Sequence, residues 1–474
     1  MVSTTMHFMP GCEILQSFDL VHWEHATYVY ETLDHTDAQQ LKSGQNIYGQ
    51  GMWAASLRYH EGRFYICFVA NDTRKTYLYT SEKIDGPWKK QLIEGFYHDG
   101  SLLFDEDGRN YIVYGNDEIW ITELNEDLTA PKKDGLHRLL VSDHKNPELG
   151  YEGSHIQKIN GYYYIFLVHS LRDRWMRTEA CFYSDSLEGE FTGGDVLCDD
   201  RGYCGQGVAQ GGIVDTPDGK WYAMLFQDSG AVGRIPILLP VTWKDHFPFF
   251  GQNGHVPEEI EVHSTRPGYI YQPLVGSDDF CNGLLPRWQF NHDPDPRYYH
   301  LDALQGTYTI TTREVCTELT QAVNTLTQRM SYPSCAAEVT VDASALKEGD
   351  VAGLCALQGC YAAVGVTKHH GKYEVLMLDK KEDGILDMTE GTVVESHQMD
   401  FRLEADFCNM KDEARCYYRV NKGDWLPIGT VHKLYFKLDH FTGCRFGLFC
   451  YAAEETGGSA CFRDFKYYDV DEIS

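Results

Sequence analysis

Residues 60–72 read HEGRFYICFVAND, a glycine turn followed by a strand rich in aromatic and aliphatic side chains. The same unit recurs three times, as DEDGRNYIVYGND over 105–117, KINGYYYIFLVHS over 158–170 and TPDGKWYAMLFQD over 216–228. The aligned tyrosines, spaced by 46, 52 and 59 residues, are Tyr65, Tyr111, Tyr163 and Tyr222. Four-stranded blades of a β-propeller repeat at this scale, because each blade buries its faces only against its neighbours. With a partial unit over 1–24, the sequence predicts a five-bladed β-propeller over residues 1–264.

The pattern changes after about residue 264. Residues 265–277 form a Pro- and Gly-bearing linker, and new short strands with different turns follow over 278–474. About two hundred residues of strands at such spacing are typical of a β-sandwich. The chain is therefore predicted to be all-β, and the second domain, which lacks a compact acid/base group, is expected to complete a site or to bind.

The charge balance excludes several classes of partner. The chain has 70 Asp and Glu against 41 Lys and Arg, a net charge of −29. A nucleic-acid-binding protein is expected to show a basic face, and an anionic membrane surface attracts basic segments. No stretch approaches the roughly 18 apolar residues of a membrane span. We therefore expect neither nucleic acid nor membrane as partner, while the oligomeric state stays open.

The cysteines point to a reducing compartment. Fifteen are scattered along the chain, and the closest pairs lack the CxxC spacing of zinc or redox sites. Free buried thiols that act as small apolar side chains are the simplest explanation. The first residues, MVSTTMHF, carry no charged leader, so a cytoplasmic location is expected.

Three polar residues stand where blades begin: Asp99 in YHDGSLLFD, Glu152 in GYEGSHIQK and Gln210 in VAQGGIVD. Asp99 and Glu152 precede the tyrosine of their units by similar distances, 12 and 11 residues. Equivalent positions in neighbouring blades converge on the central channel. Two carboxylates facing one pocket are what glycoside hydrolysis requires, one as a proton donor and the other to activate water or attack. The alternative for either residue is a solvated turn carboxylate.

The chain resembles glycoside hydrolase family 43, five-bladed propellers that include β-xylosidases and α-L-arabinofuranosidases. The resemblance spans nearly the whole chain, and the tail resembles the sandwich domain of the xylosidase-like branch. The segments that carry it include STTMHFMPG (3–11), GQGMWAASLRYHEGRFY (49–65), YHDGSLLFDEDG (97–108), YEGSHIQKINGYYY (151–164), AQGGIVDTPDGKWYAMLFQD (209–228) and GAVGRIPILLPVTW (230–243).

The resemblance implies roles for four residues. Glu152 lies in the family's E-G-x-H-I motif, which implies the general acid. Asp99 lies in the D-x-S-L motif, whose Asp tunes the pKa of the acid and orients it. Trp53 matches a platform on which the apolar face of a sugar stacks, the alternative being a core tryptophan. Arg234 matches an arginine that reaches sugar hydroxyls and catalytic carboxylates, the alternative being a structural ion pair.

The same resemblance places His7 and Phe8 in a loop that lines the sugar pocket, although a structural role is equally open. Gln210 stands where many members have a histidine near the channel axis that helps to hold calcium or water. Glutamine offers no imidazole, and no DxDxDG-type loop compensates. We therefore expect no metal ligands and no required cofactor, and a channel calcium ion is not supported by this residue.

A further departure concerns the general base. The family carries it as an Asp in a D-P-S/D motif on the innermost strand of the first blade, and this chain begins at Met1 within the following strand. Neither nearby acid replaces it, because Asp19 matches a turn of the family and Glu13 falls outside the motif, in a hairpin. We hypothesise that the sequence is an N-terminally shortened form with a three-stranded first blade and no general base.

The sequence thus predicts an exo-acting, inverting glycosidase that releases xylose, or alternatively arabinofuranose, from the non-reducing end of small oligosaccharides. Inversion implies carboxyl groups about 6.5–9.5 Å apart, which leaves room for a water. The rival prediction is a catalytically impaired carbohydrate-binding propeller, because the general base is missing.

Overall fold

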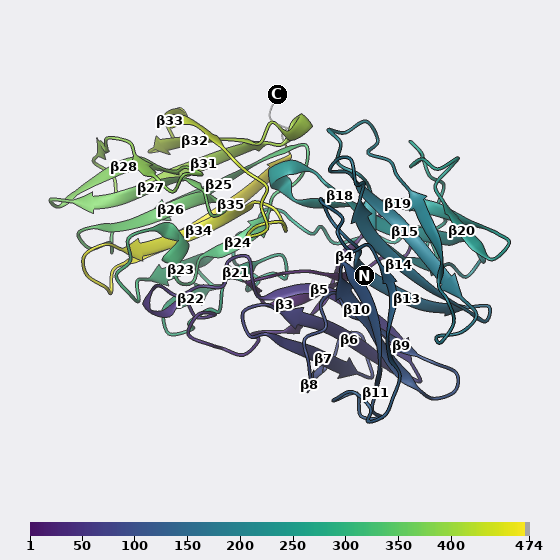
Figure 1. Cartoon of the computed structure of the whole chain (residues 1–474). Coiled ribbons are helices and arrows are strands. Elements are labelled where there is room, and N and C mark those ends of the chain that lie inside the picture. Colours follow the sequence, from purple (N-terminus) through teal and green to yellow (C-terminus); the bar gives the residue numbers. More distant parts are fainter. Residues whose placement is uncertain (470–474) are drawn as a thin grey trace.

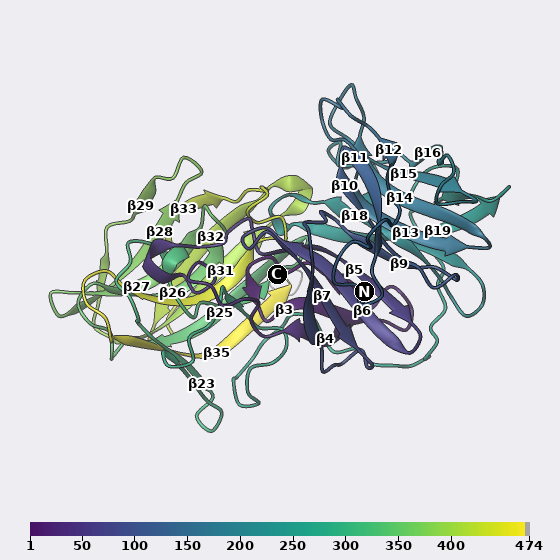
Figure 2. The ribbon, with the colours of Figure 1, turned by 60° about the horizontal axis from the view of Figure 1, so that its bottom comes forward.

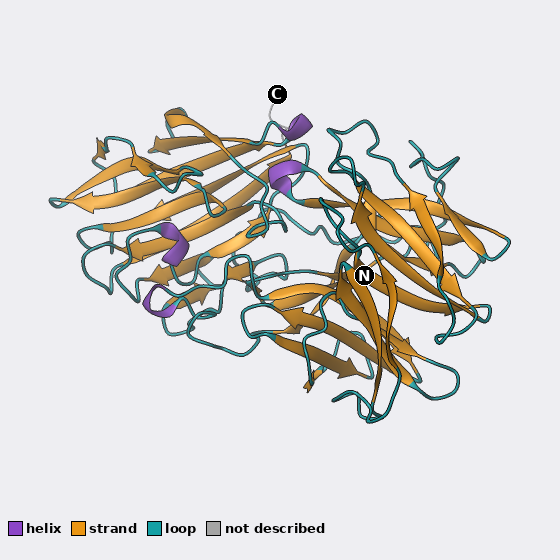
Figure 3. Cartoon of the chain, viewed as in Figure 1, coloured by secondary structure: helices purple, strands orange, loops and turns teal. Residues whose placement is uncertain are grey.

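The computed structural model describes residues 1–469, which form almost only strands and loops (Figure 3). A propeller half and a sandwich half lie side by side, and the N-terminus lies in the propeller half (Figures 1 and 2). Over the described range, no helix is long or apolar enough to cross a membrane. The helical segments there are single 3₁₀ turns, η1 (Lys42–Gly44), η2 (Gly230–Val232), η3 (Leu319–Gln321) and η4 (Cys408–Met410).

The propeller has five sheets, which confirms the predicted five blades. The first blade has three antiparallel strands, and each of the others has four. The first blade comprises β1 (Val2–Ser3), β3 (Gly11–Gln16) and β4 (Glu24–Tyr30); the second β5 (Met52–His60), β6 (Arg63–Ala70), β7 (Lys75–Ser81) and β8 (Lys89–Ile93); the third β9 (Ser101–Phe104), β10 (Asn110–Asn116), β11 (Glu118–Leu124) and β12 (His137–Ser142); the fourth β13 (Glu152–Ile159), β14 (Tyr162–Ser170), β15 (Arg177–Ser184) and β16 (Thr192–Leu197); the fifth β17 (Ala209–Asp215), β18 (Trp221–Asp228), β19 (Arg234–Lys244) and β20 (Phe247–Phe250).

The repeated aromatic strand forms the core between blades. Tyr111 of β10 and Tyr163 of β14 are both buried and belong to one apolar cluster that joins the third and fourth blades. Each blade buries both of its faces, so its second strand is apolar almost throughout, as in residues 162–170. This explains why the repeat could be read from the sequence.

The second half is a sandwich of two antiparallel sheets packed over one large core. On one sheet, buried and partly exposed residues alternate strictly along β31 (Gln398–Asp406), as expected for a sheet with one wet face. That sheet also contains β22 (Tyr299–Asp302), β23 (Thr307–Thr311), β35 (Ser459–Asp469), β25 (Ser334–Asp342), β32 (Glu413–Val420) and β33 (Leu426–Lys433). The other sheet contains β2 (Phe8–Met9), β21 (Gln289–Asn291), β24 (Leu326–Arg329), β34 (Arg445–Ala452), β26 (Asp350–Leu357), β27 (Ala362–His369), β28 (Lys372–Lys380), β29 (Leu386–Met388) and β30 (Thr392–Val394).

A strand from the propeller half belongs to the sandwich. In β2, Phe8 pairs with Asn291 and Met9 with Phe290, which adds the N-terminal hairpin to the edge of a sandwich sheet. Phe8 is fully buried in a cluster otherwise made of sandwich residues. The two halves therefore share backbone hydrogen bonds and core, which the predicted boundary near residue 264 did not anticipate.

The segment predicted as a linker also packs on the first blade. The backbone N–H of Thr265 donates to the carbonyl of Phe18 over 2.7 Å, and that of Gln272 donates to the Glu24 carboxylate over 2.8 Å. The hydroxyl of Tyr269 donates to the same carboxylate. These hydrogen bonds fix the segment along the first blade of the propeller.

Candidate active site

The structure brings Asp99 and Glu152 together at one end of the propeller. Glu152 is the first residue of β13, and Asp99 lies in the loop before β9, where its φ of 48° turns the chain. The backbone N–H of Gly153 donates to the Asp99 carboxylate over 3.0 Å, and the Ser154 hydroxyl donates to the Asp99 carbonyl over 2.7 Å. These bonds tie the third blade to the fourth and fix the two carboxylates relative to each other.

His98 lies between these two carboxylates. Its Nε2 is 3.7 Å from Oδ2 of Asp99 and 3.8 Å from Oε2 of Glu152. Burial lowers the pKa of His98, but the two carboxylates outweigh burial and leave the pKa above its ordinary value. The Asn116 amide also donates to Glu152, over 2.9 Å. His98 was not predicted from the sequence, in which its only signal is its place next to Asp99.

The surroundings of Asp99 raise the pKa of its carboxyl group above the ordinary value. Burial raises the pKa of Asp99, opposed by His98 and assisted by the negative charge of Glu152. The side chain is almost fully buried, and its second carboxylate oxygen has no hydrogen-bond partner among residues 1–469. A change of charge at Glu152 therefore changes the pKa of Asp99.

Arg234 lies at the start of β19 and faces the same site. Its guanidinium carbon is 4.4 Å from the ring centre of Phe226 and 4.3 Å from that of Phe441. The cation therefore forms cation–π contacts with two aromatic rings. Its Nε is 3.2 Å from the Asp228 carboxylate. Burial, with the nearby charge of Arg177, lowers the pKa of Arg234 to about 10, which still leaves it charged at neutral pH. The negative charges of Asp99 and Glu152 act in the opposite direction and raise that pKa.

The structure places Trp53 at the same mouth, on β5. Its indole packs edge-on to Phe441 with ring centres 5.6 Å apart, and it lies 6.0 Å from the ring of His98. The side chain is partly exposed, unlike the fully buried aromatics of the blade cores. This position fits a sugar platform better than the alternative of a core tryptophan.

Phe441 comes from the sandwich and reaches into the propeller mouth. The loop between β33 and β34 carries it, and its ring contacts both Trp53 and Arg234. Nothing in the sequence connects a residue so far along the chain with the propeller, so sequence reasoning had no means of naming it. Its contacts show that the second half completes this site.

The structure does not bring His7 and Phe8 to this mouth, and this corrects the predicted position. Both are fully buried where the propeller meets the sandwich. His7 packs against His292 and His440, with ring centres 4.9 and 5.3 Å away. Burial, together with the charges around it, lowers the pKa of His7 well below its usual range. The reason is that β2 pairs with a sandwich strand and draws this loop into the interface.

Gln210 lies beside the acid. Its φ of 65° marks a turn at the start of β17, and its side chain covers Gly153, where an added Cβ would lie 2.8 Å from Cγ of Gln210. Its backbone N–H donates to Glu179 over 2.7 Å, and its side-chain oxygen is 3.4 Å from Nη1 of Arg177. Burial raises the pKa of Glu179 well above its ordinary value, although the Gln210 N–H acts in the opposite direction.

Comparison with known proteins identifies the family. Residues 1–248 match the model of glycosyl hydrolases family 43, and residues 277–468 match the β-xylosidase C-terminal concanavalin A-like domain. The chain belongs to glycosyl hydrolases family 43. A bifunctional GH43-CE protein of Bacteroides eggerthii has a solved structure that is 41% identical, with a TM-score of 0.90, over 99% of this chain and 60% of that one. The chain thus spans little more than half the length of that protein.

Named relatives in the family include two kinds of glycosidase. A β-xylosidase of Formosa agariphila is 25% identical over 99% of this chain and 85% of its own. A non-reducing end α-L-arabinofuranosidase of Bacteroides ovatus is 25% identical over 65% of this chain and 59% of its own. By its family, this chain is a glycosidase.

In this family 43 chain, a cavity of about 790 Å³ extends from the mouth between the first and fifth blades. Arg234, Gln210 and Phe441 border it at the mouth, and apolar side chains such as Leu238 line its depth. Among its described lining residues, Glu13 is the one carboxylate. The cavity is large enough for a small sugar.

Two other carboxylates near the mouth, Glu13 and Asp228, are engaged in ion pairs. Glu13 lies 2.9 Å from Arg329 of the sandwich, and Asp228 is held at 3.2 Å by both Arg177 and Arg234. A base that activates water needs a free lone pair directed at that water. Both carboxylates instead serve to bind arginines.

His98, Asp99 and Glu152 are the one group among residues 1–469 that offers three converging His, Cys, Asp or Glu ligand atoms, all within 4.8 Å of one another. Calcium prefers six to eight oxygen ligands, and this set offers two carboxylates and one imidazole. The set does not match the ligands of calcium and fits a histidine that bridges two carboxylates.

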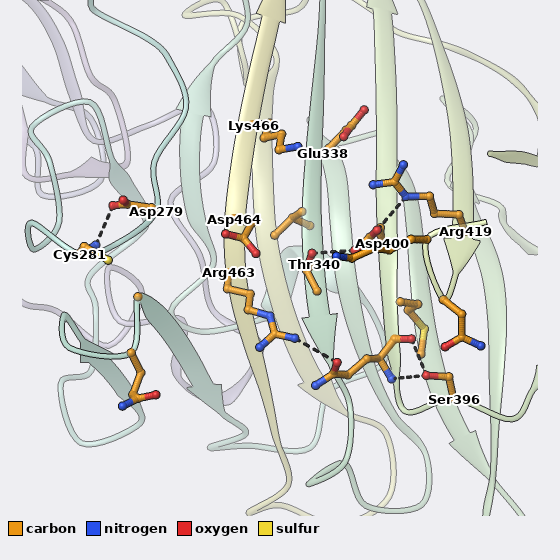
Figure 4. Close-up of a pocket in the computed structure, with 17 residues that line it drawn as sticks. Asp279, Cys281, Glu338, Thr340, Ser396, Asp400, Arg419, Arg463, Asp464 and Lys466 are labelled. Carbon is orange, nitrogen blue, oxygen red and sulfur yellow. Dashed lines mark hydrogen bonds and ion pairs between the residues drawn. The ribbon is translucent and has the colours of Figure 1, made fainter. Parts of the chain in front are cut away.

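A second hollow, of about 1050 Å³, lies on the wet face of the sandwich (Figure 4). There Asp400 accepts hydrogen bonds from Thr340 over 2.6 Å and from Arg419 over 2.7 Å, and Arg463 donates to Gln398 over 3.0 Å. None of its described lining residues is aromatic. Several of its polar groups bind one another, whereas the carboxylates of Asp99 and Glu152 converge at the propeller mouth.

Proposed function

We propose that the protein is an exo-acting, inverting glycosidase that releases xylose, and also arabinofuranose, from the non-reducing end of short oligosaccharides. The observation that carries the proposal is the pair Asp99 and Glu152, bridged by His98 at a mouth that Phe441 closes on one side. A mouth closed on one side favours chain ends over internal bonds. The named relatives support both sugars, being a β-xylosidase and an α-L-arabinofuranosidase.

In this mechanism Glu152 transfers its proton to the glycosidic oxygen as the bond from that oxygen to the anomeric carbon breaks. A water attacks the same carbon from the opposite face and gives up a proton to the surrounding water, since Glu13 and Asp228 are both paired with arginines. Asp99 and His98 set the charge beside Glu152, and Arg234 binds hydroxyls of the sugar that is released. Trp53 supports the apolar face of that sugar.

Product analysis with the 474-residue chain tests this proposal. Aryl β-xyloside and aryl α-arabinofuranoside report the sugar, and proton NMR of the first product reports the anomer, which inversion predicts to be opposite to that of the substrate. Exo action on xylotetraose releases xylose and xylotriose first. Early xylobiose, or retention of the anomeric configuration, would contradict the proposal.

The second candidate is a carbohydrate-binding propeller without turnover. It is favoured by the observation that Glu13 and Asp228 are both paired with arginines and so do not replace a general base. A thermal shift with xylose or arabinose in the absence of hydrolysis would support it. Sodium azide separates the two candidates, because an added nucleophile restores turnover where the acid is in place and only the base is missing.

We also propose a cytoplasmic location. All fifteen cysteines are free thiols, including several that are exposed, which supports a reducing compartment. Fractionation of the source cells, followed by detection of the protein in each fraction, tests this.

A further inference from the structure

The loop over residues 171–176 lies beside the candidate site. It joins β14 to β15, and in this pair Ser170 is opposite Arg177. Two residues earlier on β14, Val168 is opposite Glu152. The loop therefore leaves the fourth blade at the same end as the general acid, on the rim of the propeller mouth.

Trp175 is the exposed aromatic residue of this loop. It is 41% exposed, whereas Met176, the next residue, is buried. Its exposed neighbours in the loop, Arg172, Asp173 and Arg174, are charged. One aromatic face set among hydrogen-bonding side chains suits a sugar, which has apolar C–H faces and hydroxyl edges, better than it suits an apolar protein surface.

The loop is held rigidly. The Ser170 hydroxyl accepts from the backbone N–H of Met176 over 2.8 Å and donates to the carbonyl of Arg174 over 3.2 Å. Arg172 forms an ion pair with Asp143 across the loop base. A binding surface that is already ordered loses little entropy when a ligand arrives.

Trp175 is linked to the catalytic groups through Arg177. The guanidinium carbon of Arg177 lies 5.5 Å from the Trp175 ring centre, and its Nε is 3.2 Å from Asp228. Asp228 in turn binds Arg234, and Arg177 also reaches Gln210. The indole thus contacts Arg177, which belongs to the same ion-pair network as Arg234 at the mouth.

We propose that Trp175 is the stacking platform for the leaving-group part of the substrate, the sugar units beyond the bond that is cleaved. This rests on the proposed glycosidase function and deepens it, because it assigns this chain to oligosaccharide leaving groups rather than to small aglycones. Trp53 then serves the released sugar and Trp175 serves the chain that leaves.

Kinetics with two leaving groups test the proposal. In Trp175→Ala, kcat/KM for xylotriose is expected to fall about tenfold, since one stacking contact is lost. For methyl β-xyloside, whose leaving group is too small to reach the loop, kcat/KM is expected to stay unchanged. Trp175→Phe should restore most of the xylotriose rate, and Trp120→Ala, on the outer half of the third blade, is the matched control. Equal losses on both substrates, or none on either, would overturn the proposal.

A binding measurement separates this proposal from the proposed function. Tryptophan fluorescence of the Glu152→Ala protein is titrated with xylotriose, alone and combined with Trp175→Ala. A fluorescence change that needs Trp175 supports the platform even if the unmodified chain hydrolyses neither substrate, a result that would count against the glycosidase alone. A titration curve that is the same with and without Trp175 overturns the platform.

Discussion

His98 lies within 4 Å of both Asp99 and Glu152, and its raised pKa means that it carries a positive charge over a wider pH range. We predict that His98→Gln moves the pH profile of kcat/KM upward by about one unit, because a cation beside a carboxylate favours the ionised form and its loss raises the pKa of Asp99 further. His60→Gln, at the far end of β5, is the control. An unchanged profile in His98→Gln would show that the histidine has no part in the proton balance.

Glu179 is a second buried carboxyl. Burial raises its pKa in the folded protein well above the value of about 4.3 that it has in the unfolded chain. Folding is therefore penalised increasingly as the pH rises above that value. We predict that Glu179→Gln, which keeps an acceptor for the Gln210 N–H, raises the thermal midpoint near neutral pH and leaves it unchanged near pH 4. Glu188→Gln, at an exposed turn, serves as control; a lower midpoint near neutral pH would mean that Glu179 is ionised.

At the scale of elements, the loop between β33 and β34 completes the site by placing Phe441 between Trp53 and Arg234. We predict that Phe441→Ala raises KM about tenfold with a smaller change in kcat, since it removes a wall and about 1 kcal/mol of cation–π attraction but no proton donor. Phe249→Ala, exposed on β20, should change neither constant. A loss confined to kcat would place Phe441 in the chemistry instead.

Sequence reasoning succeeded for elements whose signal is local and failed where contacts are distant. The blade strands and the Asp99–Glu152 pair could be predicted, because a repeated strand places equivalent residues at equivalent points around a channel. Phe441 could not, because its partners lie in another domain. The positions of His7 and Phe8 were predicted wrongly because β2 pairs with Phe290 and Asn291 of the sandwich. A strand of two residues leaves no pattern in the sequence from which that pairing could be predicted.

At the scale of the whole molecule, the two halves depend on each other. Phe8 is buried among sandwich residues, Arg445 of β34 lies 3.7 Å over its ring, and Glu13 pairs with Arg329. We predict that residues 1–264 alone are insoluble or lose cooperative unfolding, because this apolar surface would face water and Glu13 would lose Arg329, its ion-pair partner. Solubility, circular dichroism and turnover of the truncated chain check this. A folded, monomeric fragment with full turnover would show that the sandwich is dispensable.

The central claim is that Glu152 is the proton donor, and the dependence of rate on the leaving group tests it most directly. Glu152→Ala is compared with the unmodified chain on xylobiose, whose leaving oxygen needs a proton, and on 2,4-dinitrophenyl β-xyloside, whose leaving group departs without one. Loss of a general acid predicts a fall of about 10²–10⁴ in kcat/KM for xylobiose and little change for the dinitrophenyl substrate. An equal fall on both substrates, or no fall on xylobiose, would contradict the claim.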